Sequence, residues 1–451
     1  MTLRIACVAV LLLAAGRPDA SARGQASVPA STTFKLNNGM RVTLVHVGAE
    51  RKAFVSLVLE TGEIDEPPYG PGLAELTADM LLQGTVARSA RQIVTETASI
   101  GATINVRAGP VTTTISGDVP SANIPHFVAL ISDLVRHPLL DTAAFERVRR
   151  ASLRALDSTL HNAGDIARQQ WRAIVFPDGP FGHPYSVEST LRQLKLGHVR
   201  NVYDDSYAAS HAHLYVSGTF VDAVAEKAIR ESFTDWTVGV PTHRRPMRAA
   251  MVHELVTLDV RGADRSVTWI GIPVSDPADS EFAALEVADM LIGGADSSRV
   301  ALDIASIERE APRGNSTLWQ RRTATYWVDV VDVRTADTGA AIGALVGELS
   351  VLMKEPPTED EVARARRRVI AAFEARNTSR EGMVSILEFM EEHGLGDGWR
   401  SGYAARVTAV TPENVRDAVA NHLDPARMAI AIVGDREAIE PQLVKLRPLV
   451  P

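Results

Sequence analysis

The order of strand-forming and helix-forming segments occurs twice along this chain of 451 residues. Each half begins with strand segments, continues through helical segments and ends with a short apolar strand, at 213–219 in the first half and at 428–433 in the second. A segment that contains prolines and basic residues, 237–250, separates the halves. We therefore predict two similar α+β domains, 30–236 and 251–451, each an antiparallel sheet covered by helices on one side.

The first two predicted strands discriminate between this fold and a doubly wound parallel sheet. They flank Asn37-Asn38-Gly39, and an Asn-Gly pair between apolar strands is typical of a tight β-hairpin. Parallel strands instead need a long crossover connection between them. The hairpin therefore favours an antiparallel sheet.

The N-terminal segment 1–22 is predicted to be a secretory signal peptide. It begins with the positive charge of Arg4, continues through an apolar run at 5–15 that is too short to span a bilayer, and ends in small residues. The one cysteine of the chain, Cys7, lies in that run, so the mature protein would contain no disulfide and no thiolate ligand. We expect a periplasmic or secreted protein, with an uncleaved membrane anchor as the alternative.

The acidic net charge argues against a nucleic-acid partner. Asp and Glu exceed Lys and Arg by 55 to 47, which gives a formal net charge of −8. Proteins that bind nucleic acid usually present a basic face, so no nucleic-acid partner is predicted.

Two histidine-containing segments have simple structural interpretations. His211 and His213 would point to one face of an extended strand and could hold a metal, but two exposed, incidental histidines at a strand end are the simpler interpretation. Glu391-Glu392-His393, just before a glycine, is typical of a helix C-terminus, where a histidine complements the helix dipole.

Three motifs resemble those of the insulinase/pitrilysin family of zinc peptidases. The segment 71–85 reads P-G-L-A-E-L-T-A-D-M-L-L-Q-G-T and is similar to the active-site helix of that family, whose usual form is H-G-L-A-H-F-L-E-H-M-L-F-K-G-T. The segment 176–185 resembles the HPYG-type loop of the family, and 293–299 resembles its GGxxSSR turn. The resemblance covers nearly the whole chain after the signal and implies two homologous domains that form half of a clam-shell chamber.

The resemblance implies a zinc site whose residues this sequence does not preserve. In the family, an H-x-x-E-H motif places two histidines on one helix face and a general-base glutamate beside the zinc-bound water. Here Glu75 and Asp79 occupy the histidine positions, and Ala78 occupies the position of the base. The third family ligand is a glutamate of a later helix, yet 147–187 contains none, and Asp157 is the nearest carboxylate at a suitable depth. No zinc is therefore predicted.

Carboxylates at these positions leave a weaker metal hypothesis open. Glu75 and Asp79, four residues apart on one helix face and joined by Asp157, could hold a hard cation such as Ca²⁺ or Mg²⁺. A solvated acidic helix face is the simpler interpretation, because no other oxygen-rich segment has calcium-loop spacing.

A second catalytic feature of the family is also missing. Active members use an arginine and a tyrosine after the SSR turn to stabilise the tetrahedral intermediate. Ungapped alignment from Arg299 places Ala305 and Pro312 at these two positions, and the nearby Arg309 or Arg313 could serve only with a shift of one turn. The sequence therefore favours a chain without zinc-peptidase activity of its own.

These observations predict a non-catalytic, peptidase-like subunit. It would pair with a zinc-bearing homologue, or with itself, to enclose and bind peptides. The alternatives are a metal-dependent endopeptidase with a remodelled site and a stand-alone peptide-binding or assembly scaffold.

Overall fold

The structure is a computed structural model that describes residues 31–66, 69–159, 162–177, 182, 188–240, 253–309, 313–321 and 324–446. The predicted signal segment 1–22 lies outside these ranges, as does most of the predicted linker 237–250. Within the described ranges, no helix combines the length and the apolar character that crossing a membrane requires.

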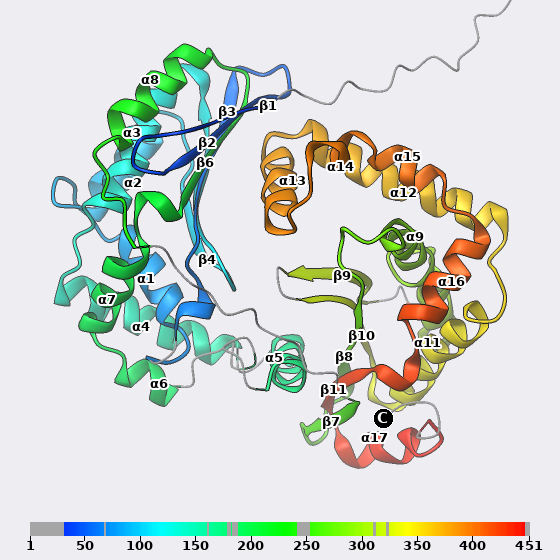
Figure 1. Ribbon diagram of the computed structural model, residues 1–451. Helices are drawn as coiled ribbons and strands as arrows, with labels where there is room; N and C mark the ends of the chain where they lie inside the picture. Colours follow the sequence, from blue (N-terminus) through cyan, green and yellow to red (C-terminus); the bar gives the residue numbers. More distant parts are fainter. Residues whose placement is uncertain are drawn as a thin grey trace, which may run out of the picture.

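The first half of the chain forms a six-stranded sheet in the order β1-β2-β6-β3-β5-β4 (Figure 1). Its strands are β1 (Ser31–Lys35), β2 (Arg41–His46), β3 (Lys52–Leu59), β4 (Asn105–Ala108), β5 (Thr113–Pro120) and β6 (Ala212–Gly218). The predicted hairpin is confirmed, because β1 and β2 pair antiparallel and the turn between them uses Gly39 at a φ of 95°.

The helices of the first half cover one face and one end of this sheet, except the fifth, which packs on the sheet of the second half. They are α1 (Leu73–Leu81), α2 (Ala90–Ser99), α3 (Ile124–Arg136), α4 (Thr142–Thr159), α5 (Ala163–Val175), α6 (Glu188–Gln193), α7 (Leu196–Ser206) and α8 (Asp222–Phe233). The helices α3 and α8 pack side by side on the outer face, whereas α1 contacts β4, α4 and α7.

The second half repeats this arrangement with five strands in the order β7-β11-β8-β10-β9. The strands are β7 (Glu254–Asp259), β8 (Arg265–Val274), β9 (Ser316–Arg321), β10 (Ala324–Arg334) and β11 (Ala429–Gly434). The helices are α9 (Phe282–Ile292), α10 (Arg299–Glu308), α11 (Thr338–Leu352), α12 (Glu359–Thr378), α13 (Arg380–Glu392), α14 (Asp397–Ser401), α15 (Tyr403–Thr408), α16 (Pro412–His422) and α17 (Arg436–Leu443).

The predicted α+β class is confirmed, and the strand pairing adds one detail that the sequence did not predict. Most neighbouring strands run antiparallel, but the closing strand of each half lies parallel to one partner, β6 beside β2 and β11 beside β7. Each closing strand reaches its place after a long run of helices, which is the kind of connection that parallel pairing needs. A mixed sheet therefore follows from the path of the chain rather than from local strand periodicity.

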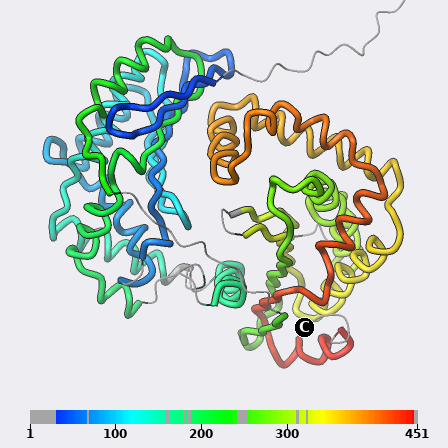
Figure 2. The backbone as a smooth tube through the Cα atoms, in the orientation of Figure 1, coloured from blue at the N-terminus to red at the C-terminus, as the bar shows by residue number. Residues whose placement is uncertain are grey.

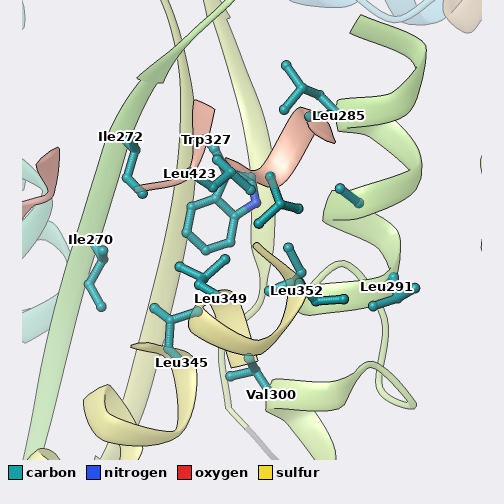
Figure 3. Close-up of a cluster of buried hydrophobic side chains, with 14 of the residues drawn as sticks. Ile270, Ile272, Leu285, Leu291, Val300, Trp327, Leu345, Leu349, Leu352 and Leu423 are labelled. Atoms are coloured by element: carbon teal, nitrogen blue, oxygen red, sulfur yellow. The ribbon is translucent and has the colours of Figure 1, made fainter. Parts of the chain in front are cut away.

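Each half has its own apolar core between its sheet and the helices that cover it. In the second half, Ile270 and Ile272 of β8 and Trp327 of β10 face Leu285 of α9 and Leu349 of α11 (Figure 3). All five side chains are nearly inaccessible to solvent. Burial of apolar surface on this scale stabilises each half without any contribution from a bound metal.

The inner face of each sheet is covered by a helix from the other half of the chain (Figure 2). The helix α5 packs on β8 and β11 of the second sheet, and α13 packs on β3 and β6 of the first. These elements correspond, because α5 and α13 follow the long helices α4 and α12, and β3 and β6 hold the places of β8 and β11. We call the two contacts the α5 seam and the α13 seam.

Candidate functional site

The helix α1, which carries the first motif, begins at a constrained turn. Gly72 precedes it with a φ of 93°, a conformation that favours glycine. Oε1 of Glu66 accepts hydrogen bonds from the backbone N–H groups of Gly72, at 2.8 Å, and Ala74, at 3.0 Å. Glu66 therefore fixes the start of α1 by satisfying N–H groups that a helix N-terminus leaves without partners.

One face of α1 is buried and holds the helix in the fold. Leu73, Leu76 and Met80 are inaccessible and belong to an apolar cluster shared with α4 and α7. This spacing of three and four residues is typical of a helix that packs along one side. The position of α1 is therefore determined by packing that involves none of the residues at the metal positions.

Glu75 and Asp79 lie one turn apart on α1, as predicted. Glu75 is exposed and Asp79 is half-buried. Desolvation by the surrounding protein raises the pKa of Glu75, and the neighbouring Glu63 raises it further while Arg107 opposes the shift. Burial, assisted by the charge of Glu75, raises the pKa of Asp79 to about 6. The pair is thus an acidic site with little compensating positive charge.

The residues at this position do not fit a zinc ion. Ala78 has 1% of its surface exposed, and its methyl group cannot accept a proton from a metal-bound water. Among the described residues, no group of three or more His, Cys, Asp or Glu side chains could hold a metal ion. The helix α4, which carries Asp157, packs beside α1, but the Asp157 side chain lies outside the described part.

The positions that correspond to the family's arginine and tyrosine contribute no polar group in the described residues. Ala305 lies on α10 and is half-buried, and Pro312 lies outside the described residues. Arg299 of the SSR-like turn binds Glu348 and Glu361 at 3.0 Å each. Arg299 therefore links α10 to α11 and α12.

The two closely spaced histidines point to different partners and share no site. The ring of His211 contacts the carbonyl oxygens of Ser206 and Val240, at 3.1 and 2.6 Å. The ring of His213 contacts Thr43 at 2.8 Å and Glu391 at 2.6 Å. The expectation of two exposed histidines on one strand face is wrong, because both side chains are buried and His211 lies in a short 3-10 helix that precedes β6.

The contact between His213 and Glu391 belongs to a polar cluster that sequence reasoning missed. Tyr215 donates a hydrogen bond to Glu391 at 2.6 Å, and Arg41 forms an ion pair with the same carboxylate. These groups line a cavity of about 280 Å³ in the α13 seam, together with Glu388. The sequence correctly places a helix end near 391–393, but local spacing gives no signal that Glu391 meets a strand of the other half.

The protein environment sets the protonation of this cluster. Burial lowers the pKa of His213, which favours a neutral ring. Burial alone would raise the pKa of Glu391, but the contacts with His213, Tyr215 and Arg41 outweigh it and lower the pKa to about 2. Burial raises the pKa of Glu388 to about 7, although Ser56 donates a hydrogen bond to it at 3.3 Å. One helix therefore carries one glutamate that is ionised at neutral pH and one that titrates near neutrality.

Family models match most of the chain, from residue 41 to residue 369, to one family of peptidases. Residues 41–185 match the model described as Insulinase (Peptidase family M16), and residues 193–369 match the model described as Peptidase M16 inactive domain. The chain belongs to the insulinase family. The resemblance drawn from the α1 motif and from the SSR-like turn is thereby confirmed at the level of the family.

Curated relatives are distant in sequence. The chain is 21% identical to an uncharacterized zinc protease of Streptomyces coelicolor, over 93% of both chains. It is 23% identical to an uncharacterized zinc protease of Rickettsia bellii, over 50% of this chain and 55% of that protein. A mitochondrial-processing peptidase subunit beta of Lentinula edodes is 21% identical over 91% of both chains.

Solved structures share the fold across both halves. A crystal structure described as a peptidase M16 inactive domain from Pseudomonas fluorescens superposes with a TM-score of 0.80 at 17% identity, over 90% of this chain and 98% of that one. A structure described as a protease from Helicobacter pylori superposes with a TM-score of 0.82 at 14% identity, over 90% and 99% of the two chains. These similarities establish the two-domain clam-shell fold.

Proposed function

We propose that this chain is a non-catalytic member of the insulinase family that pairs with a zinc-bearing homologue to enclose and bind peptides. The observation that carries the proposal is the set of residues on α1, where Glu75, Ala78 and Asp79 occupy the positions of two metal ligands and the general base. Each of those lost groups contributes several kcal/mol to catalysis in a zinc peptidase. Without them, this chain provides a binding surface rather than a reaction centre.

The packing of α1 supports a role that does not need zinc. The helix is held by its apolar face and by the Glu66 cap, so the half-chamber keeps its shape when no metal is bound. A fold whose stability is independent of its ligand can lose the ligand and retain a surface for a partner.

The names of the relatives support a paired assembly. Relatives include a mitochondrial-processing peptidase subunit beta of Lentinula edodes and a subunit alpha of Solanum tuberosum, the latter 24% identical over 60% of this chain. Proteins named as subunits are similar to this chain in sequence, so a complementary chain is the expected partner, with a self-dimer as the second choice. The proposed location is the periplasm or the exterior, where the signal segment 1–22 would direct it.

Metal analysis and copurification test this proposal. We expect the purified full chain to contain less than about 0.1 equivalent of zinc, and a homologue with an intact H-x-x-E-H motif to copurify with it at a one-to-one ratio. Stoichiometric zinc that peptide hydrolysis requires would instead support the alternative of an endopeptidase with a remodelled site. A monomer that binds peptides without a partner would support the stand-alone scaffold.

Restoring the motif gives a second test. The variant that combines Glu75→His, Ala78→Glu and Asp79→His is expected to show no peptide hydrolysis above the parent chain, because the third ligand and the oxyanion donors are still missing. Ala78 is buried, so the Ala78→Glu change alone should lower stability by about 1–3 kcal/mol. Hydrolysis by the triple variant in a fluorogenic peptide assay would show that the remaining site is competent.

A further inference from the structure

The second half of the chain contains a cavity that the proposed function leaves unused. The cavity has a volume of about 390 Å³ and is lined by α9, α12, α13, β9 and the short helices α14 and α15. Its place repeats that of the motif in the first half, because α9 follows β8 as α1 follows β3, and α12 packs beside α9 as α4 packs beside α1. The repeat is also visible in sequence, since 78–84 reads A-D-M-L-L-Q-G and 288–294 reads A-D-M-L-I-G-G.

Aromatic rings form one wall of this cavity. Phe373 stacks on Tyr403 with ring centroids 3.9 Å apart, and Trp399 lies 5.3 Å from both Tyr403 and Phe389. The four rings come from four different helices and all line the cavity. The face of an aromatic ring attracts a cation, most strongly where water is excluded.

Carboxylates line the same cavity beside the rings. Glu286 and Asp289 of α9 and Glu388 and Glu392 of α13 line the cavity, whereas Arg376 is the one basic side chain among its described lining residues. Glu286 accepts a hydrogen bond from Tyr403 at 2.8 Å, and Asp289 accepts one from the indole N–H of Trp327 at 2.8 Å. Both carboxylates are therefore held in fixed positions beside the rings.

Arg376 and Arg406, the latter over the Trp399 ring at 5.3 Å, lower the pKa of Glu286 without offsetting its burial, and Asp289 has only neutral hydrogen-bond donors. Burial raises the pKa of Glu286 to about 7 and that of Asp289 to about 6, in spite of their hydrogen bonds. Behind them on β10, Asp329 has 2% of its surface exposed, and its Oδ2 has no hydrogen-bond partner among the described residues. Burial and the nearby Asp289 raise the pKa of Asp329 to about 7. A cation in the cavity would relieve this imbalance.

An organic cation fits these walls better than a metal ion. The described residues contain no group of three or more His, Cys, Asp or Glu side chains that could hold a metal. Aromatic rings next to carboxylates are the surroundings in which proteins bind ammonium and guanidinium groups. The volume also matches a side chain or a small amine rather than a folded partner.

We propose that this cavity binds an aliphatic ammonium or guanidinium group against the aromatic wall and the carboxylates of Glu286 and Asp289. The group could belong to a basic residue of an enclosed peptide, which rests on the proposed function, or to a free amine, which does not. Both sources present the same kind of charged group. Comparing a peptide with a free amine therefore shows which of them the cavity binds.

Calorimetric titration of the full chain tests the proposal with three probes. The probes are the capped peptide Ala-Arg-Ala, its neutral analogue Ala-Gln-Ala and the free polyamine spermidine. The variants are Asp289→Asn and Glu286→Gln, which preserve shape and hydrogen-bond acceptors, with Glu374→Gln as a matched control. Glu374 is exposed on α12 and is absent from the cavity lining. Thermal unfolding of each variant checks that the fold is retained.

We expect the arginine peptide to bind about tenfold more tightly than the glutamine peptide, and each cavity variant to weaken cation binding about tenfold. Glu374→Gln should change the affinity less than twofold. Spermidine binding with the same sensitivity, in the absence of peptide binding, would identify a free amine as the ligand. Equal affinity for the two peptides, with no response of spermidine to the variants, would overturn the cavity proposal and leave general peptide binding intact. Equal weakening by Glu374→Gln would also overturn it.

Discussion

The two seams between the halves have the same geometry and different chemistry. In the α5 seam, Trp171 lies 5.5 Å from Trp319 and 5.3 Å from Tyr326, both edge to face, and Phe176 packs beside them. In the α13 seam, Glu388 and Glu391 of the helix meet polar groups of the first sheet. Equivalent helices on equivalent strands thus produce one aromatic contact and one in which charged groups accompany a small apolar cluster that includes Phe54 and Val384.

The duplicated backbone arrangement determines where the two halves contact each other. The side chains at each contact determine whether its stability depends on pH and salt. Aromatic burial depends little on pH or on salt. Partly exposed carboxylates depend on both, because pH changes their charge and salt screens their ion pairs. The α5 seam is therefore expected to hold the halves together under all conditions, and the α13 seam to adjust to the solution.

The largest effect is expected from removing the central ring of the α5 seam. Trp171 is fully buried and lies so close to Gly271 that a Cβ on that glycine would be 2.2 Å from the indole. The variant Trp171→Ala would leave a cavity at this contact and should cost about 3–5 kcal/mol of unfolding free energy. Urea denaturation followed by circular dichroism measures it.

The matched control for this change is Val221→Ala, because Val221 is 64% exposed. It should alter stability by less than about 0.5 kcal/mol. If Trp171→Ala cost less than a substitution in the α13 seam, the ranking of the two seams would be reversed.

A smaller effect is expected from Glu391→Gln in the α13 seam. The change removes a charge that balances Arg41 and weakens the contacts with His213 and Tyr215. Because the Glu391 side chain is about one third exposed, water limits the loss to about 1–2 kcal/mol. Denaturation compared with Glu381→Gln, an exposed change on the same helix, measures the difference. Equal stability of the two variants would mean that the cluster contributes nothing.

The two glutamates of α13 should give the seam opposite responses to pH. The folded state raises the pKa of Glu388 to about 7, so the unfolded chain releases this proton first and stability falls as pH rises from about 4.5 to 7. The variant Glu388→Gln should therefore be more stable than the parent by about 1 kcal/mol at pH 8 and equal to it near pH 5.

Glu391 behaves in the reverse way, since its folded pKa is about 2. Its contribution is present above about pH 4.5 and is lost as pH falls towards 2. Thermal unfolding between about pH 3 and pH 8 measures both trends. A Glu388→Gln advantage that is the same at pH 5 and at pH 8 would contradict the assignment of the titrating group.

The smallest effect is expected at the edge of the α13 seam. Arg380 binds Asp118 at 3.1 Å and Glu50 at 3.2 Å, and both acidic side chains are largely exposed. Arg380→Gln should cost about 0.5 kcal/mol at low salt and nothing measurable at about 0.5 M salt, because screening removes the attraction. Persistence of the full effect at high salt would indicate a packing role for the Arg380 stem.

Much of the fold could be predicted from local sequence. The hairpin at Gly39, the helix that carries Glu75 and Asp79, and the closing strands of both halves were predicted close to where they lie, because each depends on short-range periodicity or on turn chemistry. The parallel pairing of β6 with β2 could not be predicted, because it depends on where a distant strand returns.

The candidate site on α1 could be predicted from the sequence, whereas the cavity of the second half could not. Glu75, Ala78 and Asp79 stand out against a known motif, so their positions on α1 follow directly from the sequence. The cavity beside Asp289 gives a weaker signal, the repeated A-D-M-L segment, and its rings come from helices that are dispersed along the chain. No spacing rule brings Phe373, Phe389 and Trp399 together.

The sequence by itself determined the duplicated α+β architecture and the replacement of imidazoles by carboxylates on one helix, because both are properties of neighbouring residues. Only the tertiary structure decided that each half covers the sheet of the other, and that Glu391 meets a histidine 178 residues away. Such contacts form when the apolar faces of distant segments pack together. The burial of those faces, and no local preference, determines which charged groups lie close to one another in a low-dielectric environment.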